Sequence, residues 1–140
     1  MQRPPRRRAA AGATPARESV PAVAPQPSAE AIARAAVDAA ANKKAEDIVL
    51  LDIRALTSMA DYFVICNAST DRQLKAVVEG IEQDLKAEGV RPVHVEGEQG
   101  SGWVLVDFGD VICHVFKQQE REYYRLEDLW TGAKTLVRMQ

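Results

Sequence analysis

The segment WVLVDFGDVICHVF, residues 103–116, consists of two mostly apolar runs of six residues separated by Gly109 and Asp110. A Gly-Asp pair between two such runs is typical of the two-residue turn of a β-hairpin. This turn would place six apolar side chains on one face of the hairpin: Val104, Val106, Phe108, Val111, Cys113 and Val115. A shift of one residue would break up that face, so we predict this register and a fold built on a sheet.

The opposite face of the predicted hairpin has a mixed composition. The same register gives it three cross-strand pairs: Trp103 with Phe116, Leu105 with His114, and Asp107 with Ile112. A tryptophan beside an imidazole and a carboxylate fits the aromatic anchor and polar rim of a protein interface. A lone histidine or tryptophan on a strand is, however, more often part of a core. The residues alone therefore leave two interpretations open, a working surface or a second core with a polar edge.

Three further strands are expected before the hairpin. Residues 47–53 (DIVLLDI) and 61–67 (DYFVICN) are nearly continuous apolar runs of strand length. Runs of this kind are typical of buried strands. Residues 90–95 predict a short strand, and residues 97–102, which contain three glycines, predict a loop.

Three helices complete the predicted domain. Ser28 can cap a helix over residues 28–44. Thr70 and Gln73 form a capping-box pair before a second helix, which Gly89 is positioned to close. The apolar stripe of this second helix consists of Leu74, Val77, Val78, Ile81 and Leu85. A last helix, starting at Glu120, would align Tyr123, Leu126 and Trp130 on one side.

The predicted order is α-β-β-α-β-β-β-α, which indicates an α/β (α+β) fold in a single domain. The first two strands and the final hairpin favour antiparallel pairs, while the second helix crosses over the sheet. We therefore expect a mixed five-stranded sheet flanked by helices. The predicted boundaries are an extension at residues 1–27, the domain at 28–131 and a C-terminal tail at 132–140.

Charge is divided unequally along the chain. Residues 1–17 contain five arginines and no acid, whereas residues 18–140 hold 13 basic and 20 acidic residues, a net charge of −7. The first 27 residues are rich in Ala, Pro and Arg, which predicts a disordered extension; an organellar transit peptide is the alternative. The acidic domain argues against direct binding to phosphate backbones and is compatible with a basic protein partner. Solubility alone would also explain a charge imbalance of this size.

No pattern in the sequence predicts an enzyme, a metal site or a cofactor. Asp107-Phe108-Gly109 matches the kinase metal-binding triplet, but the other kinase loops are missing. Gly100-Ser101 could begin a nucleotidyltransferase motif, yet no D-x-D carboxylate pair follows it. The two histidines and the two cysteines match no zinc-finger spacing. Both cysteines lie in apolar runs and are expected to be free and buried, which favours a reducing compartment. No run is long enough to span a membrane.

Five blocks of sequence carry a family resemblance when they are taken together. They are DIVLLD at residues 47–52, ADYFVIC at 60–66, EG at 96–97, WVLVDFGDVICHVF at 103–116 and YYRLEDLW at 123–130. These blocks are similar to the ribosomal silencing factors, also called the Iojap family. They cover nearly the whole predicted domain, and the pattern W-x-x-x-D-x-G-D-x-x-x-H is the most specific of them.

The resemblance implies a nucleotidyltransferase-like topology without transferase activity. It also implies binding to ribosomal protein L-fourteen on the large ribosomal subunit, which blocks joining of the small subunit and lowers translation when nutrients are scarce. By position it supplies six partner-binding candidates: Glu96, Trp103, Leu105, Asp107, His114 and Tyr123. Four of the six also lie on the mixed face that the hairpin register predicts.

Other functions remain open at this point. Organellar relatives of the resembled family act in assembly of the large subunit, so the chain could be an assembly factor, reaching ribosomal RNA through its arginine-rich extension. An enzyme descended from the nucleotidyltransferase fold is a further alternative. A homodimer is possible, whereas a membrane partner or sequence-specific nucleic-acid binding is not expected. We expect a cytoplasmic protein, or a mitochondrial or chloroplast one if the extension is a transit peptide.

Overall fold

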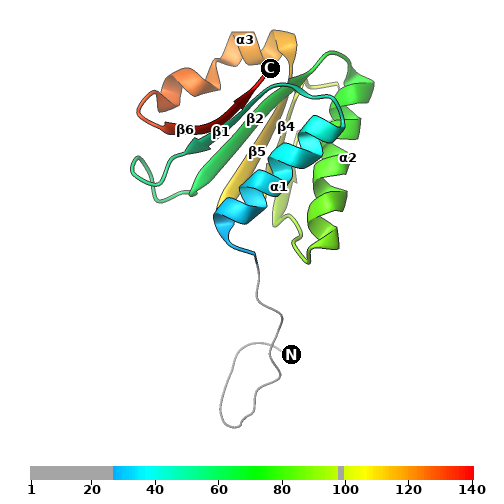
Figure 1. The fold of residues 1–140 in the computed structure, drawn as a ribbon. Helices are drawn as coiled ribbons and strands as arrows, with labels where there is room; N and C mark the ends of the chain where they lie inside the picture. The colour runs from blue at the N-terminus through cyan, green and yellow to red at the C-terminus, as the bar shows by residue number, and fades with distance from the viewer. Residues whose placement is uncertain (1–26, 98–99) are drawn as a thin grey trace.

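A computed structural model describes residues 27–97 and 100–140, and the extension expected at residues 1–27 lies, except for Pro27, outside the described residues. These residues form three α-helices, one short 3-10 helix (η1) and a single sheet, and Figure 1 shows how they are arranged. The elements are α1 Ala29–Asn42, β1 Glu46–Asp52, β2 Tyr62–Ala68, α2 Asp71–Ala87, β3 His94–Glu96, β4 Trp103–Asp107, β5 Val111–Lys117, α3 Gln118–Tyr124, η1 Leu126–Trp130 and β6 Lys134–Met139. No helix in the described part is long and apolar enough to cross a membrane.

The sheet is mixed, as predicted, and its strand order is β3-β4-β5-β2-β1-β6. Strands β2 and β5 pair in parallel, and the chain between them includes α2; the other neighbouring pairs are antiparallel. The sheet has six strands rather than the expected five, because residues 134–139 pair with β1 instead of forming a tail. This edge strand was missed because only Leu136 and Val137 are apolar and half-buried, so it shows little alternation.

The β4–β5 hairpin has the predicted register. Val106 pairs with Cys113 and Leu105 with His114, and the Phe108 N–H donates to the Val111 carbonyl at 2.8 Å. The six residues of the predicted apolar face are all buried in one core cluster. The period of two along each strand is therefore sufficient to assign its faces.

Helices α1 and α2 lie side by side over the apolar face of the sheet (Figure 1). Both begin at the predicted caps: Ser28 Oγ accepts from the Ala31 N–H at 3.1 Å, and Thr70 Oγ1 accepts from the Gln73 N–H at 3.0 Å. The Gln73 carboxamide oxygen accepts in return from the Ser69 N–H at 2.8 Å. Three small side chains of α1, those of Ala33, Ala36 and Ala40, are fully buried and allow close packing on the sheet.

The last predicted helix is divided in two. Arg125 adopts the left-handed conformation (φ 47°), which ends α3 and starts η1. Tyr123, Leu126 and Trp130 consequently do not form the single stripe that we expected. Leu126 and Trp130 pack against a second core on the other face of the sheet, whereas Tyr123 is 79% exposed.

The strand expected at residues 90–95 is displaced along the chain. Val90 instead joins the main core, and β3 begins only at His94. All three residues of β3 are exposed, because it is an edge strand that pairs only with β4. Apolar character at Val90, Val93 and Val95 was a poor guide here, since two of those three side chains remain exposed.

Candidate functional site

Five of the six candidate residues lie on three neighbouring strands and face the same side of the sheet. Glu96 on β3 pairs with Leu105 on β4, which in turn pairs with His114 on β5. Trp103 and Asp107 lie two residues to either side of Leu105 on β4, so they share its face. The sixth, Tyr123, comes from α3, and its ring contacts that of Tyr124 at 5.0 Å between centroids. Tyr124 contacts Trp103 at 4.8 Å, which joins the helix to the strands.

Burial divides this mixed face into two parts. Towards β1 and β2 it is a second core, in which Phe63, Ile65, Ile112 and Phe116 are buried. Towards the β3 edge it is more open to solvent: Trp103, Leu105 and Asp107 are half-buried, and Glu96 is exposed. The mixed face is therefore a second core at one end and exposed to solvent at the other, and the use of the exposed end as a working surface stays a prediction.

We use the name aromatic surface for the open end of the mixed face, formed by Glu96, Trp103, Leu105, Tyr123 and Tyr124. A hollow of about 200 Å³ lies within it, lined by Glu96, Gly97, Trp103 and Leu105. A side chain at position 97 would collide with the Trp103 carbonyl oxygen, and φ is 103° there, so glycine is required for the approach of the loop. Tyr124, which is 48% exposed, was not among the predicted candidates, although it lies in the quoted YYRLEDLW block.

His114 lies on the predicted face of the hairpin, but its side chain is more deeply buried than we expected. It is only 4% exposed, so it cannot contact a partner directly, and its predicted role as a contact residue is wrong in that sense. Its Nδ1 accepts a hydrogen bond from the Trp103 indole N–H at 3.3 Å, and its ring lies edge-on to Phe63 at 4.8 Å. Burial lowers the pKa of His114 to about 4, so the imidazole is neutral near pH 7.

Asp107 also has a structural role. Its carboxylate accepts from the Gly109 N–H at 2.7 Å and so stabilises the hairpin turn. The exposed pair His94 and Glu96 lies beside it on β3, with 2.7 Å between the imidazole Nε2 and the carboxylate. The polar rim of the aromatic surface therefore consists of side chains that are already ordered by local contacts.

A second polar site, which the sequence did not indicate, connects α3 and η1 to the sheet. The Arg121 side chain is 10% exposed; it donates to Glu127 Oε2 at 2.7 Å, to Asn67 Oδ1 at 2.8 Å and to the Asp47 carbonyl. Asp47 has a positive φ of 49° beside an irregularity in β1, which turns its carbonyl towards the guanidinium. Burial raises the pKa of Glu127, but the hydrogen bond and charge of Arg121 outweigh it and lower that pKa overall.

Reactive groups are not gathered into a site elsewhere in the described ranges 27–97 and 100–140. No three His, Cys, Asp or Glu side chains there are placed to hold a metal ion together. Cys66 and Cys113 are free and buried, as expected. Burial raises the pKa of Cys66 to about 12 and that of Cys113 as well, so both thiols are protonated near pH 7.

Comparison with known proteins gives consistent matches across the described domain. Residues 26–140 match the family model described as "Ribosomal silencing factor during starvation". The ribosomal silencing factor RsfS of Bacillus subtilis is 44% identical over 102 residues, 73% of this chain and 84% of that protein. A crystal structure of a Chromobacterium violaceum protein superposes with a TM-score of 0.72 at 37% identity, covering 76% of this chain and 89% of the other. Mouse mitochondrial assembly of ribosomal large subunit protein 1 is 34% identical over 92 residues, which are 64% of this chain and 40% of that longer protein.

Proposed function

The chain belongs to the ribosomal silencing factor family, and we propose on that basis that it binds the large ribosomal subunit and lowers translation by preventing the small subunit from joining. The observation that carries the proposal is the aromatic surface. It presents a half-buried tryptophan from β4 and two exposed tyrosines from α3 at the β3 side of the mixed face.

The composition of this surface fits a protein partner. Large aromatic side chains are enriched among the residues that contribute most to binding at protein interfaces, and they are commonly surrounded by a polar rim. Trp103 and Leu105 supply the apolar centre, and Glu96 supplies acidic charge at its edge. With a net charge of −7 over residues 18–140, the domain is suited to a basic partner. We propose ribosomal protein L-fourteen as that partner.

The mechanism would be steric. A domain of this size docked on the joining face of the large subunit would occupy space that the small subunit needs, without any chemical step. We place the protein in the bacterial cytoplasm, in keeping with relatives such as the silencing factor of Bacillus subtilis. Its action would be expected under nutrient limitation, as the family description "during starvation" suggests.

A second candidate function is assembly of the large subunit. It is favoured by the mouse relative, whose name describes mitochondrial assembly of that subunit. The same aromatic surface would serve in both cases, but an assembly factor would act on immature particles. Its loss would then leave incomplete large subunits, whereas loss of a silencing factor would leave mature subunits that join too readily in starved cells.

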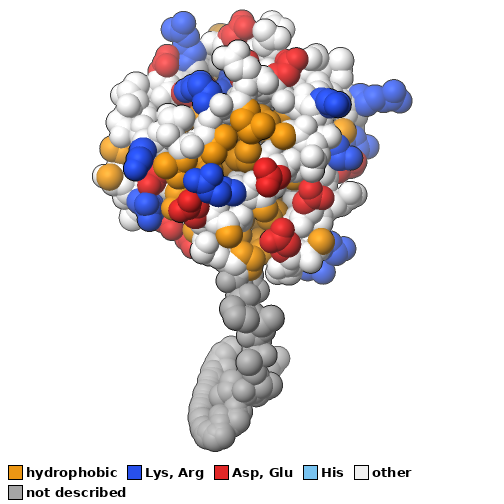
Figure 2. Space-filling model, viewed as in Figure 1, with side chains coloured by type: hydrophobic (Ala, Val, Ile, Leu, Met, Phe, Trp, Pro, Cys, Tyr) orange, Lys and Arg blue, Asp and Glu red, His pale blue; other side chains and the backbone are white. Residues whose placement is uncertain are grey.

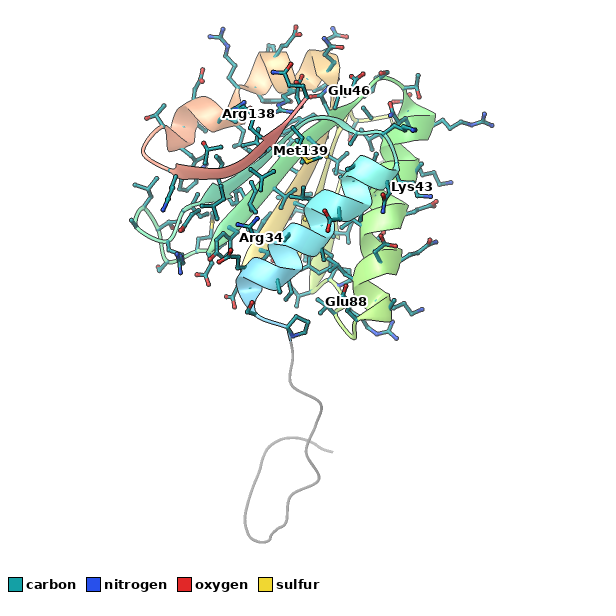
Figure 3. All side chains as sticks on the ribbon, viewed as in Figure 1. Arg34, Lys43, Glu46, Glu88, Arg138 and Met139 are labelled. Atoms are coloured by element: carbon teal, nitrogen blue, oxygen red, sulfur yellow. The ribbon has the colours of Figure 1, made fainter. Side chains whose placement is uncertain are left out.

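The experiment that tests the steric proposal follows the joining of purified subunits by light scattering. Protein added to separated subunits should slow their association, and should have much less effect on ribosomes that are already joined, because the site is then covered. Arg34→Ala is a control variant that should act like the unchanged protein, because this exposed side chain lies on α1 (Figure 3), and α1 packs on the opposite face of the sheet from the aromatic surface. Equal inhibition of separated and joined ribosomes would contradict the steric mechanism.

A further inference from the structure

His114 is the one buried residue among the six candidates. It lies on β5, an inner strand between β4 and β2, and it is 4% exposed. A residue at this depth can influence binding only through a neighbour. The neighbour that the geometry identifies is Trp103, whose indole N–H donates to His114 Nδ1 at 3.3 Å.

The two side chains form a diagonal pair across the hairpin. Trp103 lies directly opposite Phe116, and His114 lies two residues before Phe116 on the same strand. The indole stacks on Phe116 at 4.9 Å with 27° between the ring planes. Stacking holds the plane of the indole but allows it to slide and rotate within that plane. A hydrogen bond to a fixed acceptor removes this freedom, because it is directional.

The acceptor itself is held firmly. The His114 ring packs edge-on against Phe63 at 4.8 Å, and it lies nearly parallel to Phe116 at 6.4 Å, with 15° between the planes. Acceptance at Nδ1 requires the neutral tautomer with its proton on Nε2. That Nε2 is buried and has no hydrogen-bond partner among the described residues. An apolar ring in the same place would avoid burying this polar atom, so stability alone does not account for a histidine here.

We infer that His114 is a positioning residue, which holds the indole of Trp103 in the orientation that the partner recognises. The inference rests on the proposed docking role of the aromatic surface, and it assigns to His114 a function that needs no contact with the partner. It also gives a reason for a polar side chain at this buried position, since an apolar ring could not accept from the indole N–H.

The test compares two substitutions at His114. His114→Phe keeps a planar ring but removes the acceptor, whereas His114→Asn places an amide oxygen close to the position of Nδ1. The chain has two tryptophans, and Trp103→Phe assigns their indole N–H signals in a spectrum of nitrogen-15-labelled protein. We expect His114→Phe to increase hydrogen exchange at the Trp103 indole at least tenfold. We expect it also to weaken binding to the large subunit about tenfold, without lowering the melting temperature.

His114→Asn should restore much of the indole protection and of the affinity. A mutant cycle gives a second, independent measurement that does not require the Asn variant to fold. In a Trp103→Phe background, where no indole N–H exists, His114→Phe should cause no further loss of affinity.

Three results would overturn the inference. One is weaker binding in His114→Phe with unchanged indole exchange, which would mean that His114 acts by another route. Another is faster indole exchange in His114→Phe with unchanged affinity, while Trp103→Ala still weakens binding. This result would support the docking surface but contradict the positioning role of His114. Unchanged affinity in Trp103→Ala would instead remove the docking surface itself, and the positioning role with it.

Discussion

Trp103 and Val106 lie three residues apart on β4 and therefore face opposite sides of the sheet. Val106 is fully buried in the core beneath α1 and α2, while Trp103 is half-buried at the open end of the mixed face. Two residues of the same strand thus have different structural roles. One holds the two layers together, and the other presents an aromatic ring to solvent.

Substitution of these two residues should separate binding from folding. Trp103→Ala should weaken binding to the large subunit by about 2 kcal/mol or more, because it removes the central aromatic anchor; this corresponds to roughly a thirtyfold loss of affinity. Val106→Asp should unfold the domain, since it buries an unpaired charge. Melting temperature and affinity measured on each variant check both expectations. If Trp103→Ala destabilises the fold as severely as Val106→Asp, the tryptophan is a core residue and the surface assignment is wrong.

His114 should make stability depend on pH. Its pKa falls from an ordinary 6.5 to about 4 in the folded state through burial. The unfolded chain therefore binds more protons between these values, and the free energy of unfolding should decrease as pH falls from 6.5 to 4. The full contribution is about 3 kcal/mol, at 1.36 kcal/mol for each pKa unit. Urea denaturation of the unchanged protein and of His114→Phe at several pH values measures this contribution. An equal decrease in the free energy of unfolding of both proteins would exclude His114 as the source.

At the scale of elements, the decisive features are the segments after β5. Strand β6 pairs with β1 and forms an edge of the sheet (Figure 1), and α3 and η1 cover only the inner part of the mixed face. Arg121 holds the segment that contains these two helices in place, because it links Glu127 in η1 to Asn67 in β2 and to the Asp47 carbonyl in β1. The position of α3 on the sheet also places Tyr124 against Trp103, so these contacts help to form the aromatic surface.

Removal of the Arg121 guanidinium should therefore lower the free energy of unfolding more than removal of an exposed arginine side chain. Arg121→Ala leaves three acceptors without their donor, and we expect the free energy of unfolding to fall by about 2 kcal/mol. Arg34→Ala breaks only the exposed ion pair with Glu30 on α1, and it should change the free energy of unfolding by less than about 0.5 kcal/mol. Chemical denaturation of both variants gives the comparison. Similar small losses would mean that the contacts of Arg121 do not stabilise the fold.

For the whole molecule, the two faces of the sheet differ in chemistry. On the side of the molecule that carries α1 and α2, the surface presents a central group of hydrophobic side chains with both acidic and basic side chains around it (Figure 2). The aromatic surface lies on the other side of the sheet, at its β3 edge. The arginine-rich residues 1–17 precede α1, whereas the excess of acidic charge belongs to the rest of the chain. The proposed docking surface and the basic segment therefore belong to different parts of the sequence.

A chain that starts at Ser28 should behave like the full chain. It keeps the cap of α1, in which Ser28 Oγ accepts from the Ala31 N–H, and all the described elements. The removed residues contain almost no large apolar side chains, so they have little with which to build a core. Melting temperature and large-subunit affinity should be unchanged within error. A large loss of affinity, strongest at low salt, would show that the arginines contact ribosomal RNA.

The sequence by itself determined the features that depend on local period and local chemistry. The two-residue turn and the alternation of residues 103–116 predicted the register and both faces of the hairpin, and Ser28 and Thr70 predicted the starts of two helices. These features can be predicted from the sequence because each depends on side chains only a few residues apart.

The tertiary structure alone decided which end of the mixed face is a core and which is a surface. That outcome depends on where α3 and η1 lie, and Arg121 sets their position through Asn67, which is 54 residues away in the sequence. The pairing of β6 with β1 and the burial of His114 are likewise long-range results. No periodic pattern encodes such contacts, because they follow from the packing of segments that meet only in the folded chain.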